Sequence, residues 1–550
     1  MKLRTCIGLM VGLLFMGVST NAQALQVISG DITVNTTWGA ADNEVLLRGA
    51  VFVRQPATLT ILAGTTVYGE KASIGTLIID RGAKINAVGT VASPIVFTSD
   101  QITPARGDWG GLILNGNAPL NVQGGVAIGE GDTGEYGGSN PSDNSGTLRY
   151  VRVEYAGIEF SPDNELNGIA FQGVGSGTMV DHIQVHANKD DGIEMFGGTV
   201  NAKYVLCTSI ADDSFDWTFG WTGKAQFWVA QQSGDDADQG IEADNLEEDH
   251  NATPRSAPTI YNMTLIGDPD TNEGDESDKG MLLRRGTGCI IRNAIVVGFK
   301  EEGLDIDDQA TYQQAQTGGL VVDNSIFWNN NPNFSDSSDD TAPPFTVEQF
   351  ANTIMTDVQV TDPMLGAPYD LSSPDFRPSS GSPAVRGAVS VAIPPIDGFF
   401  ESVDFIGGVD PDNDWTRQAW TTFGASTIAF GSIDIKANGQ DGPMTVSSSS
   451  PVGLTISLDP GTYAGQNADL WLYTWVYTAA GWNLYSYVFP GGWRLGFWQT
   501  TTIPLTSLSG LTVFNGQLPA GAYYFYFVAD DNADGVIDVT WWDAVEVTVQ

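Results

Sequence analysis

Short runs of hydrophobic and β-branched residues, each closed by a glycine turn, recur along the first 400 residues of the chain. Examples are the segments Leu59–Gly64, Leu77–Gly82 and Leu112–Gly116. A second group pairs each run with an acidic corner, in the segments Asp190–Glu194, Asp212–Asp216, Asp238–Glu242, Asp278–Leu282 and Glu301–Asp305. Their starting positions differ by 22, 26, 40 and 23 residues, so the repeat is about 23 residues long with one insertion before Asp278.

Short strands with polar corners at this period are typical of a parallel β-solenoid. Asn262, Asn293 and Asn324, each 31 residues after the last, mark equivalent strands of successive coils. Because each coil stacks on the one before it, a repeated residue becomes a column with a spacing of about 4.8 Å. The Leu-x-x-Leu-x-Leu pattern of leucine-rich repeats is absent. We therefore expect an all-β chain with stacked parallel strands.

Several segments resemble the right-handed parallel β-helix proteins, of pectate-lyase-like fold, that many bacteria secrete. The resemblance rests on Ala57–Thr65, Pro94–Ser99, Gly107–Gly111, the Asp-Asp-Gly-Ile-Glu corner and the closing segment Asp375–Pro383. It covers roughly residues 25–420 and implies the fold. It does not specify a function, because this fold is shared by lyases, hydrolases, adhesins and other surface proteins.

The pattern changes after residue 420, where residues 421–435 read as a linker and residues 436–550 alternate as antiparallel strands do. Six or more such strands predict a small immunoglobulin-like β-sandwich. In the predicted strand Leu470–Tyr477, the side chains of Trp471, Tyr473 and Trp475 share one face, and the hairpin partner adds Tyr485 and Tyr487. If the aliphatic face is the core, these aromatic residues form a platform for sugar rings. The alternative is that they are themselves the core or pack on the β-helix.

The first 24 residues read as a secretory signal peptide. Lys2 and Arg4 are followed by an apolar stretch from Ile7 to Val18 and by the cleavage motif Ala22-Gln23-Ala24. No later segment has 18 continuous apolar residues, so we expect an exported chain without an integral membrane segment. Two cysteines, Cys207 and Cys289, follow the predicted cleavage site, and they either form one disulfide or lie in the core as thiols.

Acidic residues dominate the charge of the 550-residue chain, with 66 Asp and Glu against 24 Lys and Arg and a formal net charge of −42. This charge argues against unassisted binding to nucleic acids or anionic membranes, because both would be repelled. Three His and three Cys leave few ligands for zinc, copper or iron. Calcium needs neither residue type, since it binds six to eight oxygen atoms.

Part of the acidic charge is expected to form a column on the β-helix. Carboxylates stacked about 4.8 Å apart repel one another unless they are solvated, protonated or bound to a hard cation. We predict a calcium site in this column, with a solvated acidic face as the alternative. The candidate ligands are the six acidic residues of two successive corners, Asp190, Asp191, Glu194, Asp212, Asp213 and Asp216.

A second candidate calcium site lies near the end of the chain, in the segment Asp530–Asp538. It resembles the calcium loop of EF-hands and dockerins, and the residues at its ligand positions are Asp530, Asn532, Asp534, Asp538 and, through its carbonyl, Val536. Gly535 fits the sharp turn of such a loop, but Trp541 occupies the place of the bidentate Glu or Asp. The alternative is a hairpin turn rich in Asp, Asn and Gly.

The acidic corners also allow an enzymatic reading. Asn188–Asp191 followed by Asp212 and Asp213 loosely resembles the active site of polygalacturonase-like hydrolases. Acidic pairs recur at too many coils to single out one site, and no His or Arg follows at the next corners. Pectate-lyase-like enzymes combine calcium with a Lys or Arg base, for which Lys189 is the candidate. Surrounding carboxylates raise the pKa of a lysine and make it a poorer base, so charge compensation is the alternative role.

Together these features predict a secreted or cell-surface β-helix protein that calcium stabilises and that binds a carbohydrate or another surface. The alternatives are an extracellular polysaccharide lyase or hydrolase acting at the acidic corner, and a purely structural surface component. The sequence leaves the ligand and the oligomeric state open.

Overall fold

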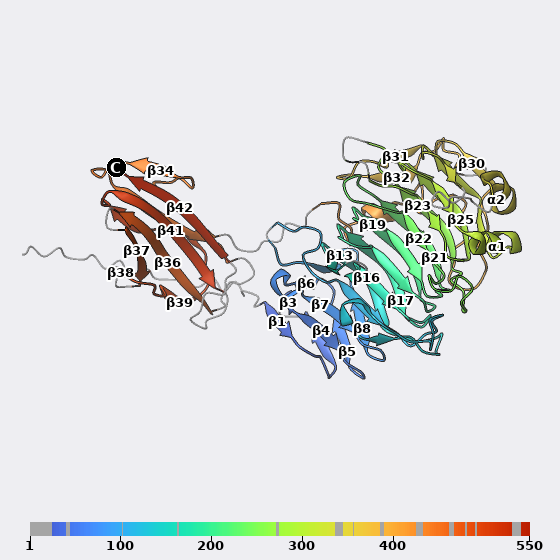
Figure 1. The fold of residues 1–550 in the computed structure, drawn as a ribbon, viewed down its shortest axis with the longest axis horizontal. Helices are drawn as coiled ribbons and strands as arrows, with labels where there is room; N and C mark the ends of the chain where they lie inside the picture. The colour runs from blue at the N-terminus through green and yellow to red at the C-terminus, as the bar shows by residue number, and fades with distance from the viewer. Residues whose placement is uncertain are drawn as a thin grey trace, which may run out of the picture. The chain divides into compact units, whose positions relative to one another are not determined.

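The protein is described from a computed structural model. The structure describes residues 25–39, 44–101, 103–161, 164–270, 274, 276–335, 345–355, 357–385, 390–424, 433–460, 467–478, 481–489, 492–530 and 541–550. The chain forms two compact units, which span residues 25–430 and 431–550 and are described separately (Figure 1). The predicted signal peptide lies outside the described residues. None of the described helices is long and apolar enough to cross a membrane.

The first unit is a stack of parallel strands, which confirms the predicted parallel β-helix (Figure 1). One sheet has sixteen strands: β1 (Gln26–Ser29), β2 (Thr36–Trp38), β3 (Glu44–Arg48), β5 (Thr58–Ile61), β6 (Thr66–Gly69), β8 (Lys84–Val88), β9 (Ile95–Ser99), β13 (Gly146–Glu154), β17 (Met179–His186), β19 (Asn201–Thr208), β21 (Lys224–Gln231), β23 (Thr259–Ile266), β25 (Cys289–Val297), β27 (Leu320–Asp323), β28 (Ser325–Trp328) and β30 (Val358–Val360). A second sheet has ten strands: β4 (Ala50–Val53), β7 (Thr76–Ile79), β10 (Leu112–Asn115), β16 (Ile169–Gln172), β18 (Ile193–Phe196), β20 (Phe215–Thr218), β22 (Ile241–Ala243), β24 (Leu282–Leu283), β26 (Leu304–Ile306) and β29 (Phe334–Ser335).

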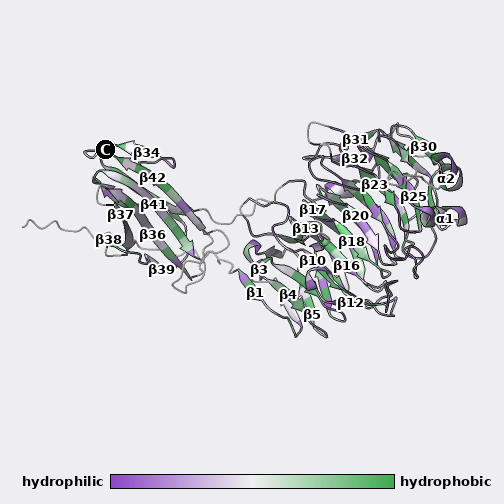
Figure 2. Ribbon diagram, in the orientation of Figure 1, coloured by the Kyte–Doolittle hydropathy of each residue, from purple (hydrophilic) through white to green (hydrophobic). Residues whose placement is uncertain are grey.

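The register of the second sheet reproduces the repeat seen in the sequence. Glu194 pairs with Asp216, Asp216 with Glu242, Glu242 with Leu282, and Leu282 with Asp305. The flanking residues of each strand, such as Ile193 and Met195 in β18, lie in the hydrophobic core between the sheets. Because side chains alternate along a strand, the column that starts at Glu194 points away from that core. Hydrophobic residues run along the strands of both units (Figure 2).

Residues in the left-handed backbone conformation form a ladder along the long strands of the sixteen-stranded sheet. In chain order they are Tyr150, His182, Tyr204, Phe227, Asn262, Asn293 and Asn324, with φ between 49° and 59°. Asn adopts this conformation at little cost, which explains the repeated asparagines. The four aromatic members stack on one another, with ring centroids 4.6, 4.3 and 4.8 Å apart. The asparagine part of the ladder matches the repeat in the sequence, whereas the aromatic part was not foreseen.

The chain after β30 returns along the side of the β-helix, and side-chain amides hold it there. Gln184 binds Thr422, Gln226 binds Glu401, Asn262 binds Phe405, Asn293 binds Ala392 and Asn324 binds Ser390, in each case through a backbone group of the returning segment. We call this segment, residues 390–424, the strap. Trp415 and Trp420 in the strap cover the aromatic part of the ladder by edge contacts with His182. A short hairpin, β31 (Leu365–Ala367) and β32 (Asp375–Pro378), precedes the strap, which also contains the 3-10 turn η3 (Trp415–Arg417).

Two helices, α1 (Gln309–Thr317) and α2 (Val347–Ile354), lie near the last coils (Figure 1). Helix α2 begins with a capping box in which Thr346 and Gln349 satisfy each other's backbone amides. The Tyr312 and Phe345 rings stack at 4.2 Å, and Phe350 joins them in the core. Apolar residues of the helices thus cover the core of the final coils. The N-terminal half carries the short turn η1 (Lys71–Ser73).

The second unit consists of antiparallel sheets, as the alternating pattern predicts; among its described strands, only β34 and β42 pair in parallel. A three-stranded sheet contains β33 (Ile433–Ala437), β35 (Val452–Leu458) and β40 (Leu508–Gly516). A seven-stranded sheet contains β34 (Met444–Val446), β36 (Asn467–Thr478), β37 (Gly481–Val488), β38 (Gly492–Leu495), β39 (Thr501–Pro504), β41 (Gly521–Asp530) and β42 (Trp541–Val549). The immunoglobulin-like arrangement stays a prediction. In the first unit, Cys207 and Cys289 are buried free thiols.

We predict that the ladder and the strap stabilise the β-helix through Asn293. Its amide accepts a hydrogen bond from the Ala392 N–H at 2.8 Å and donates one to the Ala392 carbonyl at 2.9 Å. Asn293→Gly leaves both groups without a partner and should lower the free energy of unfolding by roughly 2–4 kcal/mol. Asn293→Ala should cost about 1 kcal/mol more, because φ is 58°. Chemical denaturation measures both losses, and equal losses in the two variants would contradict the role of the left-handed backbone.

Candidate functional site

Seven carboxylates gather at the corners of two successive coils and form what we call the acidic cluster. Their oxygen atoms fall into three groups in which all atoms lie within 4.8 Å of one another. The groups are Glu165 with Asp190 and Asp212, Asp191 with Glu194 and Asp216, and Asp191 with Asp212 and Asp213. The structure therefore brings together all six acidic residues predicted from the repeat and adds Glu165.

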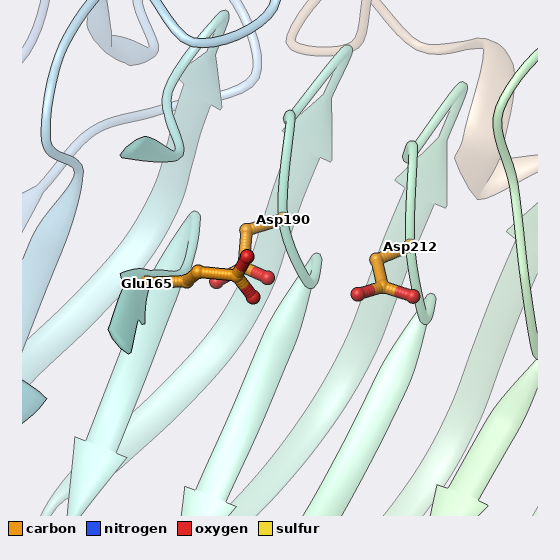
Figure 3. Close-up of side chains that lie close together, drawn as sticks. All are labelled: Glu165, Asp190 and Asp212. Atoms are coloured by element: carbon orange, nitrogen blue, oxygen red, sulfur yellow. The ribbon is translucent and has the colours of Figure 1, made fainter. Parts of the chain in front are cut away.

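The fold dictates most of this convergence. Asp190 and Asp191 lie in the turn before β18, and Asp212 and Asp213 lie in the equivalent turn before β20, one coil further on. Parallel stacking therefore places the two pairs side by side. Glu165 belongs to the hairpin β14 (Ile158–Ser161) and β15 (Asn164–Leu166), and its side chain points toward Asp190 (Figure 3).

Sequence reasoning missed Glu165 because it is not part of the repeat. It is the one member of the cluster that comes from an inserted hairpin, and the only signal in the sequence is an acidic residue in an interruption between coils. A second insertion contains β11 (Ala127–Ile128), the turn η2 (Glu130–Asp132) and β12 (Glu135–Tyr136). Glu130 of this insertion adds to the negative potential at Glu194.

Burial and mutual repulsion make the charged state of the cluster costly. Four of its members, Asp190, Asp191, Glu194 and Asp213, are each at most 8% exposed. Burial, followed by the neighbouring carboxylates, raises the pKa of Asp190 to about 9 and that of Asp212 to about 6. The same causes raise the pKa values of Asp191, Glu194, Asp213 and Asp216 well above the ordinary range.

Basic residues neutralise the same acidic column on later coils. Arg284 forms an ion pair with Glu242 and a second with Asp244 at 2.9 Å. Further along, Lys279 pairs with Asp305 at 2.9 Å. In the described part of the chain, no Lys or Arg forms an ion pair with Glu194, Asp216 or the four aspartates of the corners before them. The carboxylates of the acidic cluster thus differ from Glu242 and Asp305 of the same column, which are held in ion pairs.

The donor set of the cluster fits a hard cation such as calcium. Calcium binds carboxylate, amide and carbonyl oxygens. Asp216 Oδ1 of the cluster is buried without a hydrogen-bond partner. So is the side-chain oxygen of the adjacent Asn167, whose amide N–H donates to Glu194 at 2.7 Å. Buried oxygen atoms without partners are what an oxygen-binding cation would satisfy.

The spacing of the same carboxylates bears on the enzymatic reading. An inverting pair of carboxyl groups stands about 6.5–9.5 Å apart and a retaining pair about 5–5.5 Å apart. The nearest oxygens of Asp190 and Asp212 lie within 4.8 Å of each other, which is closer to the retaining spacing. Lys189 Nζ lies 2.6 Å from Asp236, which is the charge compensation expected as its alternative role. Both residues line a cleft of about 330 Å³ together with Glu165, Asp190 and Asp212.

The second predicted calcium site cannot be placed in the same way. Asn532, Asp534, Val536 and Asp538 lie outside the described residues. Asp530 ends β41, is fully buried and stands opposite Asp469 of β36 in the sheet. The calcium loop stays a prediction.

An exposed aromatic surface lies on one face of the seven-stranded sheet. Trp475 and Tyr477 of β36 share this face with Trp482 of β37, because Tyr477 stands opposite Trp482 in the hairpin. The face continues onto β41 and β42 through the pairs of Trp475 with Tyr524 and of Val528 with Trp542. We call its six residues the aromatic platform: Trp475, Tyr477, Trp482, Tyr524, Tyr526 and Trp542. Trp475, Tyr477, Trp482 and Trp542 are 42, 51, 56 and 61% exposed.

The sequence predicts that five aromatic residues share one exposed face of this sheet, and the structure agrees for only some of them. Tyr473 lies on the platform face and stacks on Tyr526 at 5.0 Å, whereas Trp471 on that face is buried beneath Phe497. Tyr485 stands opposite Thr474, so Tyr485 and Tyr487 point to the other side of the sheet. The prediction failed for these two tyrosines because the hairpin register decides which alternate residues share a face.

We predict that the cluster destabilises the protein when calcium is chelated. Because the pKa of Glu194 is raised in the folded chain, the folded state binds more protons than the unfolded state above about pH 4.5, and stability falls as the pH rises. Glu194→Gln should therefore raise the melting temperature in chelator at pH 8, and the gain should shrink toward pH 4.5. Calorimetry tests this against the exposed control Glu248→Gln. A gain that is independent of pH, or equal in the control, would contradict it.

The sequence was compared with known proteins. Residues 30–363 match the family described as the pectate-lyase like beta helix domain. A solved structure, the enzymatically active domain of tailspike protein 2 of bacteriophage CBA120, is 10% identical over 91% of this chain and 71% of its own, with a TM-score of 0.20, too low to support an argument. Curated protein sequences gave no match. Since the family match spans more than half of the 550 residues, the chain belongs to the pectate-lyase-like β-helix family.

Proposed function

We propose that this protein acts outside the cell or on its outer surface, where it binds a polysaccharide through the aromatic platform and is stabilised by calcium at the acidic cluster. The observation that carries the proposal is the platform itself. A soluble sheet that leaves four large aromatic side chains about half exposed on one face keeps apolar area in water that folding could have buried.

The platform has the size and chemistry of a sugar-binding surface. Ring centroids of Tyr477 and Tyr524 lie 5.0 and 5.8 Å from that of Trp482, so the rings form a continuous surface. Trp475, Trp482, Tyr524 and Tyr526 line a shallow hollow of about 360 Å³. Flat rings pack against the C–H faces of pyranose sugars, and tyrosine hydroxyls offer hydrogen bonds at the rim. The four residues that line the hollow are uncharged, which favours an uncharged glycan there. Glu546 lies on the same face of the sheet, opposite Tyr524.

Calcium at the acidic cluster has a structural role in this proposal. The cluster joins two corners of the β-helix to the β14–β15 hairpin through Glu165. A divalent cation among these oxygens offsets their repulsion and ties the hairpin to the coils, as Arg284 and Lys279 do for the column on later coils. Binding to the folded state alone then adds directly to stability.

We predict that glycan binding depends on the platform. Trp475→Ala or Trp482→Ala should weaken binding to a neutral polysaccharide at least tenfold, because central aromatic contacts contribute about 2 kcal/mol. The panel should include cellulose, xylan, galactomannan, polygalacturonate and alginate, measured by pull-down and calorimetry with calcium present. Trp328→Ala on β28, which is 40% exposed in the other unit, is the matched control. Binding that survives both platform substitutions would contradict the proposal.

The same panel separates binding from catalysis. A binding protein leaves the polymers intact, whereas a lyase releases unsaturated products that absorb ultraviolet light and a hydrolase releases new reducing ends. Products that disappear in Asp190→Asn would replace the proposal by a depolymerase acting at the acidic cleft. If the protein neither releases products from any polymer nor binds one, the purely structural role remains.

We predict that calcium raises the melting temperature by several degrees, since a ligand at 100 times its Kd adds about 2.7 kcal/mol. Asp191→Asn and Glu194→Gln should abolish most of this rise, and Glu248→Gln should keep it. Asp534→Asn reports separately on the predicted C-terminal loop. Calorimetric titration of the chelator-treated protein gives the number of sites. A melting temperature that does not respond to calcium or chelator would overturn the role assigned to the cluster.

A further inference from the structure

The seven-stranded sheet carries a second feature on the face opposite the platform, a cleft of about 470 Å³. Its walls are mainly apolar and aromatic, and they include Val476, Tyr485, Trp493, Phe514, Tyr523 and Phe525. We call it the apolar cleft. It is separate from the platform because Tyr485 and Val476 belong to the alternate set of residues along β37 and β36.

The cleft arises from the unequal width of the two sheets. The three-stranded sheet contacts the larger one through β33, which packs on β41 and β42. On the other side of the three-stranded sheet, β40 pairs with β35 alone among the described strands. Strand β40 is therefore the edge of that sheet. Phe514 of β40 is thus one wall of the cleft, and Tyr485 of β37 and Trp493 of β38 are the other. Leu518 and Pro519, directly after β40, form the rim.

The chemistry of the lining selects an uncharged ligand. Among the described residues of this unit, no Asp, Glu, Lys or Arg lines the cleft, although the chain carries a net charge of −42. A charged ligand would lose its hydration there without gaining a partner. The volume lies within the range of pockets that bind small molecules, which typically combine apolar walls with few polar groups. The polar side chains here include Thr474, Thr478 and Asn483, all along the β36–β37 hairpin, beside the hydroxyl groups of Tyr485 and Tyr523.

One polar atom of the wall lacks a partner. Trp493 packs edge-on against Phe525 and Tyr487, with centroids 5.9 and 5.7 Å away. Its indole Nε1 lies beneath the surface without a hydrogen-bond acceptor. A buried donor without an acceptor costs about 1–3 kcal/mol. A ligand that brings a carbonyl or ether oxygen to this wall, with a small shift of the ring, would remove that cost.

We infer that the apolar cleft binds an uncharged, mainly apolar molecule with one hydrogen-bond acceptor, such as an acyl or aryl ketone, ester or amide. This site goes beyond the proposed glycan binding, since it uses the other face of the sheet and a different ligand chemistry.

The neutral fluorophore 6-propionyl-2-dimethylaminonaphthalene tests this inference on the full-length protein, because it has an apolar body and one ketone acceptor. We expect saturable one-to-one binding with a blue-shifted emission and a Kd on the order of 10–100 µM, as the size of the molecule allows. Leu518→Trp and Thr478→Trp, which fill the rim, should each abolish the signal. Trp493→Phe, which keeps the wall but removes the N–H, should weaken binding about two- to tenfold.

Trp482→Phe on the opposite face is the matched control and should bind the fluorophore as the wild type does. Circular dichroism establishes which variants are folded, and two rim substitutions are used so that one folded variant suffices. The inference is overturned if the wild type shows no saturable binding, if a folded rim variant binds normally, or if Trp482→Phe abolishes binding. An unchanged affinity of Trp493→Phe would overturn the assignment of its N–H as donor.

Discussion

The stacking of parallel strands at about 4.8 Å governs the first unit, because it turns every repeated residue into a column. Apolar columns such as that of Ile193 and Phe215 make the core, and the left-handed residues make a ladder that bends each coil at the same place. The same rule forces carboxylates of neighbouring corners together, whatever their repulsion. The acidic cluster is therefore a consequence of the fold, whereas elsewhere on the column Arg284 and Lys279 neutralise the carboxylates through ion pairs.

Features that obey this rule could be predicted from the sequence, and features that break it could not. The repeat aligned Glu194, Asp216, Glu242 and Asp305 in the register that the structure has. Glu165 escaped because an inserted hairpin has no counterpart on other coils. Tyr485 and Tyr487 were assigned to the wrong face because a hairpin's register depends on its turn, which strand alternation alone does not determine.

The two units handle surface chemistry in different ways. In the β-helix the distinctive feature is the acidic cluster, in which largely buried carboxylates lie close together because the corners repeat from coil to coil. In the C-terminal unit it is an antiparallel sheet whose two faces diverge. One face exposes aromatic rings to solvent, and the other leaves an uncharged cleft beside a narrower sheet. Because side chains alternate between the two faces of the seven-stranded sheet and the second sheet is narrower, the aromatic platform and the apolar cleft lie on opposite faces and share no residue.

The strap changes how the β-helix responds to force. A solenoid contacts itself only between neighbouring coils, so pulling at one end would peel it open a coil at a time. Amide side chains of residues from Gln184 to Asn324 hold the strap across several coils. A force that pulls on the last coil is then also borne by earlier coils, because the strap is hydrogen-bonded to them. The unit is expected to give way in one event at high load.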